Sequence, residues 1–239
     1  MTSRSLAAEE VVSMTVTGRH GTDEAGALRA LRDENASVRL RAALAAGSAP
    51  DPRVVEELVE RCAVEPEFFV RDMLTWALTR HPVDDILPRL LVEVRSERAQ
   101  ARSQALHTLS KVGDRRAWPA IGRALLTDAD DEVARSAWRT AVLLVPEGEE
   151  AALAAVLVTQ LGRGGRETRL SLSRALIALG CAMAPALDTA KRASDPAVRA
   201  HALATERLGR EPDTGFALAL EEAKRVVALG GAGGGGKGA

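Results

Sequence analysis

The sequence is poor in aromatic residues and in cysteine. Aromatic side chains make up 3% of the 239 residues and tyrosine is absent, so alanine, leucine and valine must build the core. This composition predicts packed helices, because alanine and leucine head the helix propensity scale. The two cysteines, Cys62 and Cys181, lie far apart in the chain and show no metal-ligand spacing such as C-x-x-C. Isolated thiols of this kind suit a reducing compartment.

Long apolar runs are also missing. No stretch reaches the length of about 18 apolar residues that a transmembrane helix needs, so we expect no membrane contact. The first residues, MTSRSLAAEEVVSM, lack the apolar core of a signal peptide, which predicts a cytoplasmic protein. The net charge of −1 and the pI of about 6.5 argue against general attraction to nucleic acid or anionic lipid.

Patterns that would carry chemistry are scarce. None of the histidines is followed by glutamate, and no two of them share a helix at ligand spacing, so we expect neither a metal nor a cofactor. The glycines of LGRGGRE (161–167) follow no predicted strand, which favours a flexible turn over a phosphate-binding loop. No Ser/His/Asp or Cys/His set can be placed by spacing. The sequence therefore predicts a protein without catalytic residues.

An arginine recurs every 30 to 34 residues along the chain. These anchor arginines are Arg39, Arg71, Arg102, Arg135, Arg169 and Arg199. A proline or glycine stands eleven residues after five of the six, where a helix should stop. Residues one before, three after and six after each anchor are mostly apolar or small, and they share one narrow helical stripe. Each anchor therefore marks a helix of about three turns with one buried side.

A second set of amphipathic segments lies between the anchor helices. They cover residues 52–62, 84–94, 115–126 and 149–161. Three prolines should sit in or near these first helices of each pair and bend them: Pro88, Pro119 and Pro185. No strand-like alternation appears. The unit is thus helix, tight turn, helix, repeated about six times.

Residues 113–148, GDRRAWPAIGRALLTDADDEVARSAWRTAVLLVPEG, resemble a HEAT repeat of the short PBS-lyase HEAT-like type. The match consists of a proline in the first helix, acids before the second, and then V-x-R and alanine. Similar repeats cover residues 24 to 210. The resemblance implies an all-α, right-handed α-solenoid of about six helical-hairpin repeats. HEAT-like segments attached to actinobacterial MerR-type transcription regulators are also similar, although the chain shows no identifiable helix-turn-helix.

The repeat pattern predicts four regions. Residues 1–23 would form an N-terminal capping helix with a flexible start, and residues 24–212 the repeat array. Residues 213–229 would form a capping helix at the other end of the array, and the glycine-rich residues 230–239 a disordered tail.

The anchor column has two interpretations, an anion-binding row and a structural ladder. Asp130, Asp131 and Glu132 should begin a helix, where the dipole and capping favour negative charge. The HEAT resemblance implies that such acids also pair with the anchor arginine of a neighbouring repeat. We favour the structural ladder for all six anchors, because the column persists while the residues around it vary.

In HEAT arrays the second helix of each pair lines the concave surface. Positions one, five and eight after each anchor would face it, and the candidate partner-binding residues are Asp72, Trp76, Ser103, His107, Thr140 and Arg174. A tryptophan on this face is typical of an interface anchor. The alternative is that Trp76 packs against a neighbouring repeat. This surface predicts a non-catalytic scaffold that binds a protein or peptide.

Three other functions stay open. Residues 89–123 hold eight basic groups and three acids, a net charge of +5, and Arg98, Arg115 and Arg116 would meet an acidic partner, a phosphate or a nucleic acid. Nucleic-acid binding of this kind would depend steeply on salt. The name of the repeat suggests a bilin-lyase-like activity as one alternative. Asp72 with aromatic neighbours suggests a DNA-glycosylase-like activity as another. No residue of this chain can be assigned to bilin attachment.

Overall fold

The computed structural model describes residues 25–213 and 215–232, and within these ranges every regular element is a helix. This confirms the predicted all-α class for the described part of the chain. The fold divides into two compact units, one ending at Val112 and the other beginning at Gly113. Each unit holds three of the six anchor arginines. The predicted N-terminal capping helix, within residues 1–23, lies outside the described residues.

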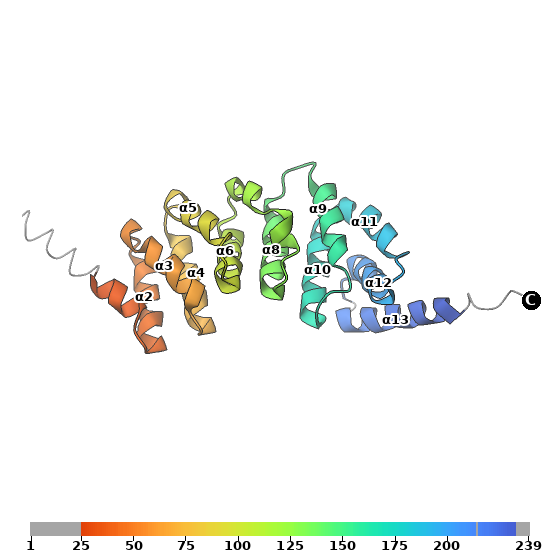
Figure 1. Ribbon diagram of the computed structural model, residues 1–239, viewed down its shortest axis with the longest axis horizontal. Helices are drawn as coiled ribbons and strands as arrows, with labels where there is room; N and C mark the ends of the chain where they lie inside the picture. Colours follow the sequence, from red (N-terminus) through yellow and green to blue (C-terminus); the bar gives the residue numbers. More distant parts are fainter. Residues whose placement is uncertain (1–24, 214, 233–239) are drawn as a thin grey trace, which may run out of the picture. The chain divides into compact units, whose positions relative to one another are not determined.

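The first unit is built from two layers of helices (Figure 1). α2, α4 and α6 stand in one layer, where α4 packs against both of its neighbours. α3 and α5 form the other layer and pack on α6. The bounds are Ala36–Ser48 for α2, Val55–Val64 for α3, Phe68–Arg80 for α4, Val83–Glu93 for α5 and Ala99–Val112 for α6. A 3-10 turn, Pro52–Val54, precedes α3.

The second unit repeats this arrangement. α8 packs on α10 and α10 on α12, while α7, α9 and α11 form the other layer (Figure 1). α13 packs along α12 through the buried Phe216, Ala219, Leu220 and Ala223. The α-helices are Arg123–Leu126 (α7), Asp131–Leu144 (α8), Glu150–Leu157 (α9), Arg166–Ala178 (α10), Met183–Ala190 (α11), Pro196–Arg210 (α12) and Phe216–Ala232 (α13). The 3-10 turns are Arg115–Ala120, Val158–Gln160 and Gly180–Ala182.

The predicted apolar stripe is buried in four of the anchor helices. All three stripe positions are buried in α4, α6, α8 and α10. In α2 the buried face is shifted by one residue, to Arg39, Ala43 and Ala46, and Ala45 is exposed. Gly47 belongs to this buried face, and α2 approaches α4 closely there. A Cβ at Gly47 would lie 2.8 Å from the Cα atom of Ala77.

Acidic and amide side chains begin several of these helices. Asp130 accepts hydrogen bonds from the backbone N–H groups of Glu132 and Val133, which confirms the predicted start of α8. Asn35 and Asp195 cap α2 and α12 in the same way. These caps satisfy N–H groups that have no partner inside the helix.

Two boundary predictions are wrong. The segment 115–126 is not one helix: a 3-10 turn ends at Ala120 and α7 begins only at Arg123. Pro119 lacks a backbone donor and Gly122 adopts an extended conformation, so the helix is interrupted between them. At the other end, α13 continues to Ala232, three residues into the predicted disordered tail. The rest of that tail, 233–239, lies outside the described residues.

No single helix in the described ranges is both long and apolar enough to cross a membrane. The two segments 166–178 and 180–190 reach this length and apolarity only when they are taken together, and the chain bends by 116° between them.

Candidate functional site

Four of the anchor arginines close the turn that precedes their own helix. Their Nη1 atoms donate hydrogen bonds to the backbone carbonyls six and five residues earlier, at distances of 2.7–3.0 Å, in Arg39, Arg71, Arg102 and Arg199. The guanidinium thus satisfies two carbonyl oxygens that no helix uses. This contact gives the repeat a fixed turn, which is a structural role for the column.

Arg39 also makes the inter-repeat ion pair that the HEAT resemblance implies. Its Nε and Nη2 atoms each lie 2.7 Å from the carboxylate of Glu65, which stands in the turn ahead of α4. Arg61 adds a third contact at 2.8 Å. Glu65 is fully buried. Burial alone would raise the pKa of this carboxyl, but the hydrogen bonds from Arg39, from the backbone of Glu67 and from Arg61 lower it to about 2.

The fourth repeat departs from this pattern. The carbonyl six residues before Arg135 belongs to Ala129, and it accepts its hydrogen bond from Nη2 of Arg163 instead, at 3.0 Å. Arg163 also binds the carboxylate of Asp131, at 2.8–2.9 Å. Arg135 is left with one ion pair, to Glu132 at 2.8 Å, and its buried Nε atom has no partner. A residue outside the anchor column has therefore taken the turn-closing role, so the predicted ladder role is wrong for Arg135.

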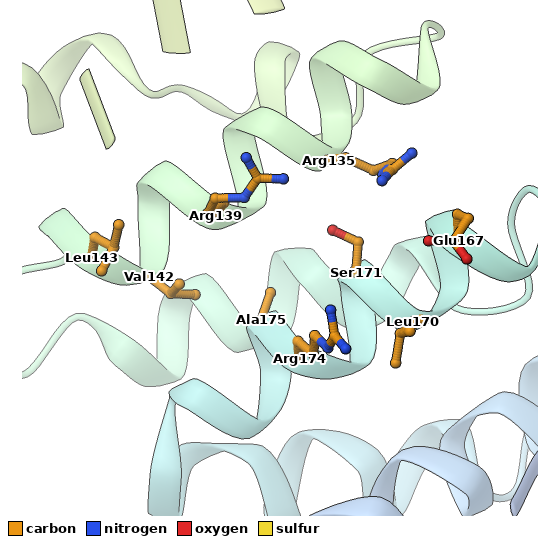
Figure 2. A pocket seen from close by; sticks show the side chains of 9 residues that line it. All are labelled: Arg135, Arg139, Val142, Leu143, Glu167, Leu170, Ser171, Arg174 and Ala175. Carbon is orange, nitrogen blue, oxygen red and sulfur yellow. The ribbon is translucent and has the colours of Figure 1, made fainter. Parts of the chain in front are cut away.

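A groove of about 270 Å³ lies between α8 and α10, and Arg135 faces it (Figure 2). α8 contributes two arginines and two apolar residues, and α10 contributes three polar and two apolar residues. The lining residues are Arg135, Arg139, Val142, Leu143, Glu167, Leu170, Ser171, Arg174 and Ala175. Figure 2 shows the side chains from the two helices on opposite sides of the groove.

The groove combines positive charge with exposed apolar surface. Three guanidinium groups, from Arg135, Arg139 and Arg174, stand against one carboxylate, Glu167. Leu143 is 55% exposed at the end of the groove away from Glu167 (Figure 2). Guanidinium groups present flat, forked donors that match carboxylate and phosphate oxygens. The groove is therefore suited to a ligand that carries negative charge next to an apolar group.

The predicted partner-binding residues separate into exposed and buried sets. Asp72 is exposed, Arg174 is exposed and lines the groove, and His107 is half-buried. Ser103 and Thr140 are buried, so the prediction that they face a partner is wrong. The Thr140 hydroxyl donates a hydrogen bond to the Ser136 carbonyl at 2.7 Å, one turn earlier in the same helix. Small polar residues of this kind enter a helix interface when the helix itself supplies their acceptor.

Trp76 is partly exposed, as an interface anchor would be, and partly packed against a neighbouring helix. It is 38% exposed, and its ring also lies against α2: a Cβ at Gly47 would be 2.4 Å from the Cζ3 atom of the indole. Five other large apolar side chains described in this unit are exposed as well: Leu44, Val64, Phe68, Phe69 and Val92. One side of the Trp76 ring is thus a packing surface, and the rest is open to solvent.

One of the three arginines predicted to form the basic patch is paired with a carboxylate. Arg116 forms a forked ion pair with Asp114, with contacts of 2.7–3.1 Å. Arg98 lines a polar pocket in the first unit in which three arginines and three glutamates stand together: Arg32, Arg61 and Arg98 with Glu57, Glu60 and Glu93. Arg115 is exposed. These surroundings give two of the three residues a nearby carboxylate.

Burial keeps the side chains of Cys62 and His201 in their neutral forms near neutral pH. Burial raises the pKa of the Cys62 thiol to about 12, so it stays protonated near neutral pH. Burial also lowers the pKa of His201 to about 4, and its Nδ1 atom accepts a hydrogen bond from the Gly162 backbone. The described residues contain no cluster of three or more histidine, cysteine, aspartate or glutamate side chains that could hold a metal ion.

No protein-family model matches the chain, and no curated protein is significantly similar to it.

Sequence reasoning found one groove residue, Arg174, and missed the others that give the groove its character. Arg139 and Ser171 were overlooked because they stand four and two residues after their anchors, outside the positions assigned to the concave face. A signal for Arg139 was present, since it lies four residues after Arg135 and shares its helical face. Nothing in the sequence pattern indicated that Arg163 replaces Arg135 in the turn.

Proposed function

We propose that this chain is a non-catalytic binding protein built from HEAT-like repeats, and that the groove between α8 and α10 holds an acidic peptide segment of a partner protein. The repeat interpretation is supported by the recurring helix pairs and by the turn-closing arginines. The binding interpretation is supported by one observation above all, the three arginines that line a groove with an apolar end.

The charge of the groove favours a peptide over an apolar ligand. Arg174 is exposed and makes no hydrogen bond or ion pair with another described residue, so its full donor capacity is available to a ligand. An acidic side chain placed between Arg139 and Arg174 would receive charge-assisted hydrogen bonds, which are about twice as strong as neutral ones. The Leu143 end of the groove, one helical turn beyond Arg139, would accept an apolar side chain.

The separation along α8 gives the expected pattern of the peptide. Arg139 and Leu143 are four residues apart, which is about 6 Å of helix at 1.5 Å per residue. An extended peptide covers the same distance in about two residues. We therefore expect an acidic residue and an apolar residue spaced by two positions in the bound segment.

The test measures fluorescence anisotropy with short labelled peptides that share the same leucines and carry either glutamates or lysines. We expect the acidic peptide to bind and the basic peptide not to bind. The double substitution Arg139→Glu with Arg174→Glu should weaken acidic-peptide binding by about a hundredfold or more, since each charge-assisted contact contributes on the order of 1.5 kcal/mol.

The matched control is Arg123→Glu, which reverses the charge of an exposed arginine on α7, outside the groove lining. This variant carries a charge change of the same kind on the same unit, so it should bind the acidic peptide as the parent chain does. Equal losses in the control and the groove variant, or binding of both peptides alike, would refute a specific groove.

A further inference from the structure

The lining of the α8–α10 groove carries more positive charge than one carboxylate neutralises. Arg135, Arg139 and Arg174 contribute three positive charges and Glu167 one negative charge, a net of +2. Glu132 lies outside the lining and pairs with Arg135 at 2.8 Å, which reduces the net charge around the groove to +1. A phosphate monoester carries about −1.5 to −2 charges at neutral pH, whereas a carboxylate carries about −1.

Two anchors depart from the common pattern: Arg169 donates from Nη2 to the Gly162 carbonyl, seven residues earlier, and Arg135 binds no carbonyl of its turn. In four anchors the Nη1 atom donates to carbonyls of the anchor's own turn: Arg39, Arg71, Arg102 and Arg199. In the turn before Arg135, this hydrogen bond comes from Arg163 instead. The loop that carries Arg163 is shaped for this contact. Gly164 has a φ of +67°, and a Cβ there would lie 2.6 Å from the Asp131 carboxylate that Arg163 binds. The fold thus releases one anchor arginine to the groove at a fixed position.

Ser171 adds a hydroxyl to the guanidinium groups. It lies on α10 one turn before Arg174, on the face that meets α8, and Figure 2 shows its oxygen directed toward the α8 side of the groove. A phosphoryl group has three terminal oxygens, each an acceptor, and the groove offers at least three separate donor groups. A carboxylate has only two oxygens and so offers these donors one acceptor atom fewer than a phosphoryl group.

Resting on the function proposed above, we infer that the acidic group of the bound peptide is a phosphoserine or phosphothreonine, held between Arg139, Ser171 and Arg174, with Arg135 adding positive charge. The groove would then bind the partner only when the partner is phosphorylated, and the apolar end near Leu143 would bind a neighbouring apolar side chain.

The experiment compares three oriented peptide libraries that differ only in a fixed central residue, which is phosphoserine, glutamate or serine. Anisotropy gives the dissociation constant of each against the full chain. We expect phosphoserine to bind about tenfold more tightly than glutamate, and serine to show no binding, because the extra charge adds about one charge-assisted contact. Equal binding of phosphoserine and glutamate would overturn the phosphate assignment and leave the proposed function standing. Failure of both to bind would overturn the proposed function.

Two further arms identify the source of the preference. Arg174→Lys keeps the positive charge but loses the forked geometry, so it should reduce the ratio between phosphoserine and glutamate while Arg123→Glu leaves that ratio unchanged. Inorganic phosphate should displace the phosphoserine library only at millimolar concentration, because it lacks the peptide contacts. Displacement by inorganic phosphate at the dissociation constant of the peptide would show a site for free phosphate and would refute a phosphopeptide.

Discussion

The buried carboxylate of Glu65 offers the sharpest test of how the first unit is held together. Replacing Glu65 with glutamine keeps its shape but removes the charge that Arg39 and Arg61 contact at 2.7–2.8 Å. Removing one partner of a buried ion pair costs about 3–5 kcal/mol. Independently, a pKa lowered from 4.5 to about 2 means that folding stabilises the charged form relative to the neutral form by about 3 kcal/mol more than water does. Both arguments place the loss at about 3 kcal/mol.

The assay is urea unfolding followed by hydrogen exchange of peptides from α2 to α4, which reports on the first unit separately. With a urea m-value of about 2 kcal/mol/M, the midpoint should fall by about 1.5 M. The control is Glu60→Gln in α3, the helix that precedes Glu65; the Glu60 side chain is 61% exposed and lies 3.8 Å from Arg32. That exposed pair contributes well under 1 kcal/mol, so its midpoint should hardly move. An unchanged midpoint for Glu65→Gln would refute the reasoning.

The same residue predicts how the first unit responds to acid. Because the pKa of Glu65 is lower in the folded chain than in the unfolded chain, its contribution is complete above pH 4.5 and is lost as the pH falls through about 2. Glu65→Gln should therefore flatten the stability profile of the first unit between these values. A profile as steep as that of the parent chain would assign the acid response to other groups.

Three further predictions concern packing and titration elsewhere. His201 is fully buried and its pKa is lowered to about 4, so the second unit should be most stable above pH 6.5 and should lose about 3 kcal/mol of stability in all as the pH falls through 4. Urea midpoints of His201→Asn measured across this range should vary less than those of the parent chain. Gly47→Ala should destabilise the first unit by about 1–2 kcal/mol in urea, because the new methyl group meets Trp76 and its overpacking exceeds the helix propensity gain of about 1 kcal/mol; higher stability would contradict the close approach. Arg163→Ala should lower the melting temperature by a few degrees through loss of the contacts to Asp131, whereas a change at the exposed Arg123 should not.

The periodicity of the sequence was sufficient to predict the helix pairs. Stripe residues such as Leu74, Ala105 and Trp138 are buried because their 3.6-residue period fixes which side of each helix meets its neighbours. The start of α8 was also predictable, since Asp130 has the local capping chemistry that any helix N-terminus requires. Features of this kind depend on residues close together in the chain, which a single sequence displays directly.

Boundaries and helix phase were harder to predict because they depend on contacts between helices. The face that α2 buries includes Gly47, where α4 approaches closely, and no pattern within α2 indicates that distance. The interruption of the 115–126 segment follows from Pro119 together with Gly122, although Pro88 is tolerated inside α5. A proline in the first turn of a helix costs little. A proline further along is tolerated only where the residues around it stay helical, as they do around Pro88 but not at Gly122.

The candidate groove shows why a repeated residue cannot be assigned one role from its column alone. All six anchors occupy equivalent places in the sequence, and the same chemistry, a guanidinium near a turn, suits both the closing of that turn and the binding of an anion. What separates Arg135 from the rest is Arg163, 28 residues later, whose side chain reaches back to Ala129 and Asp131. Because Arg163 donates to the turn carbonyl, Arg135 is not held in the turn; it pairs with Glu132 and lines the groove. The search for binding residues in such a chain should therefore start from turns that are closed by an arginine other than their own anchor.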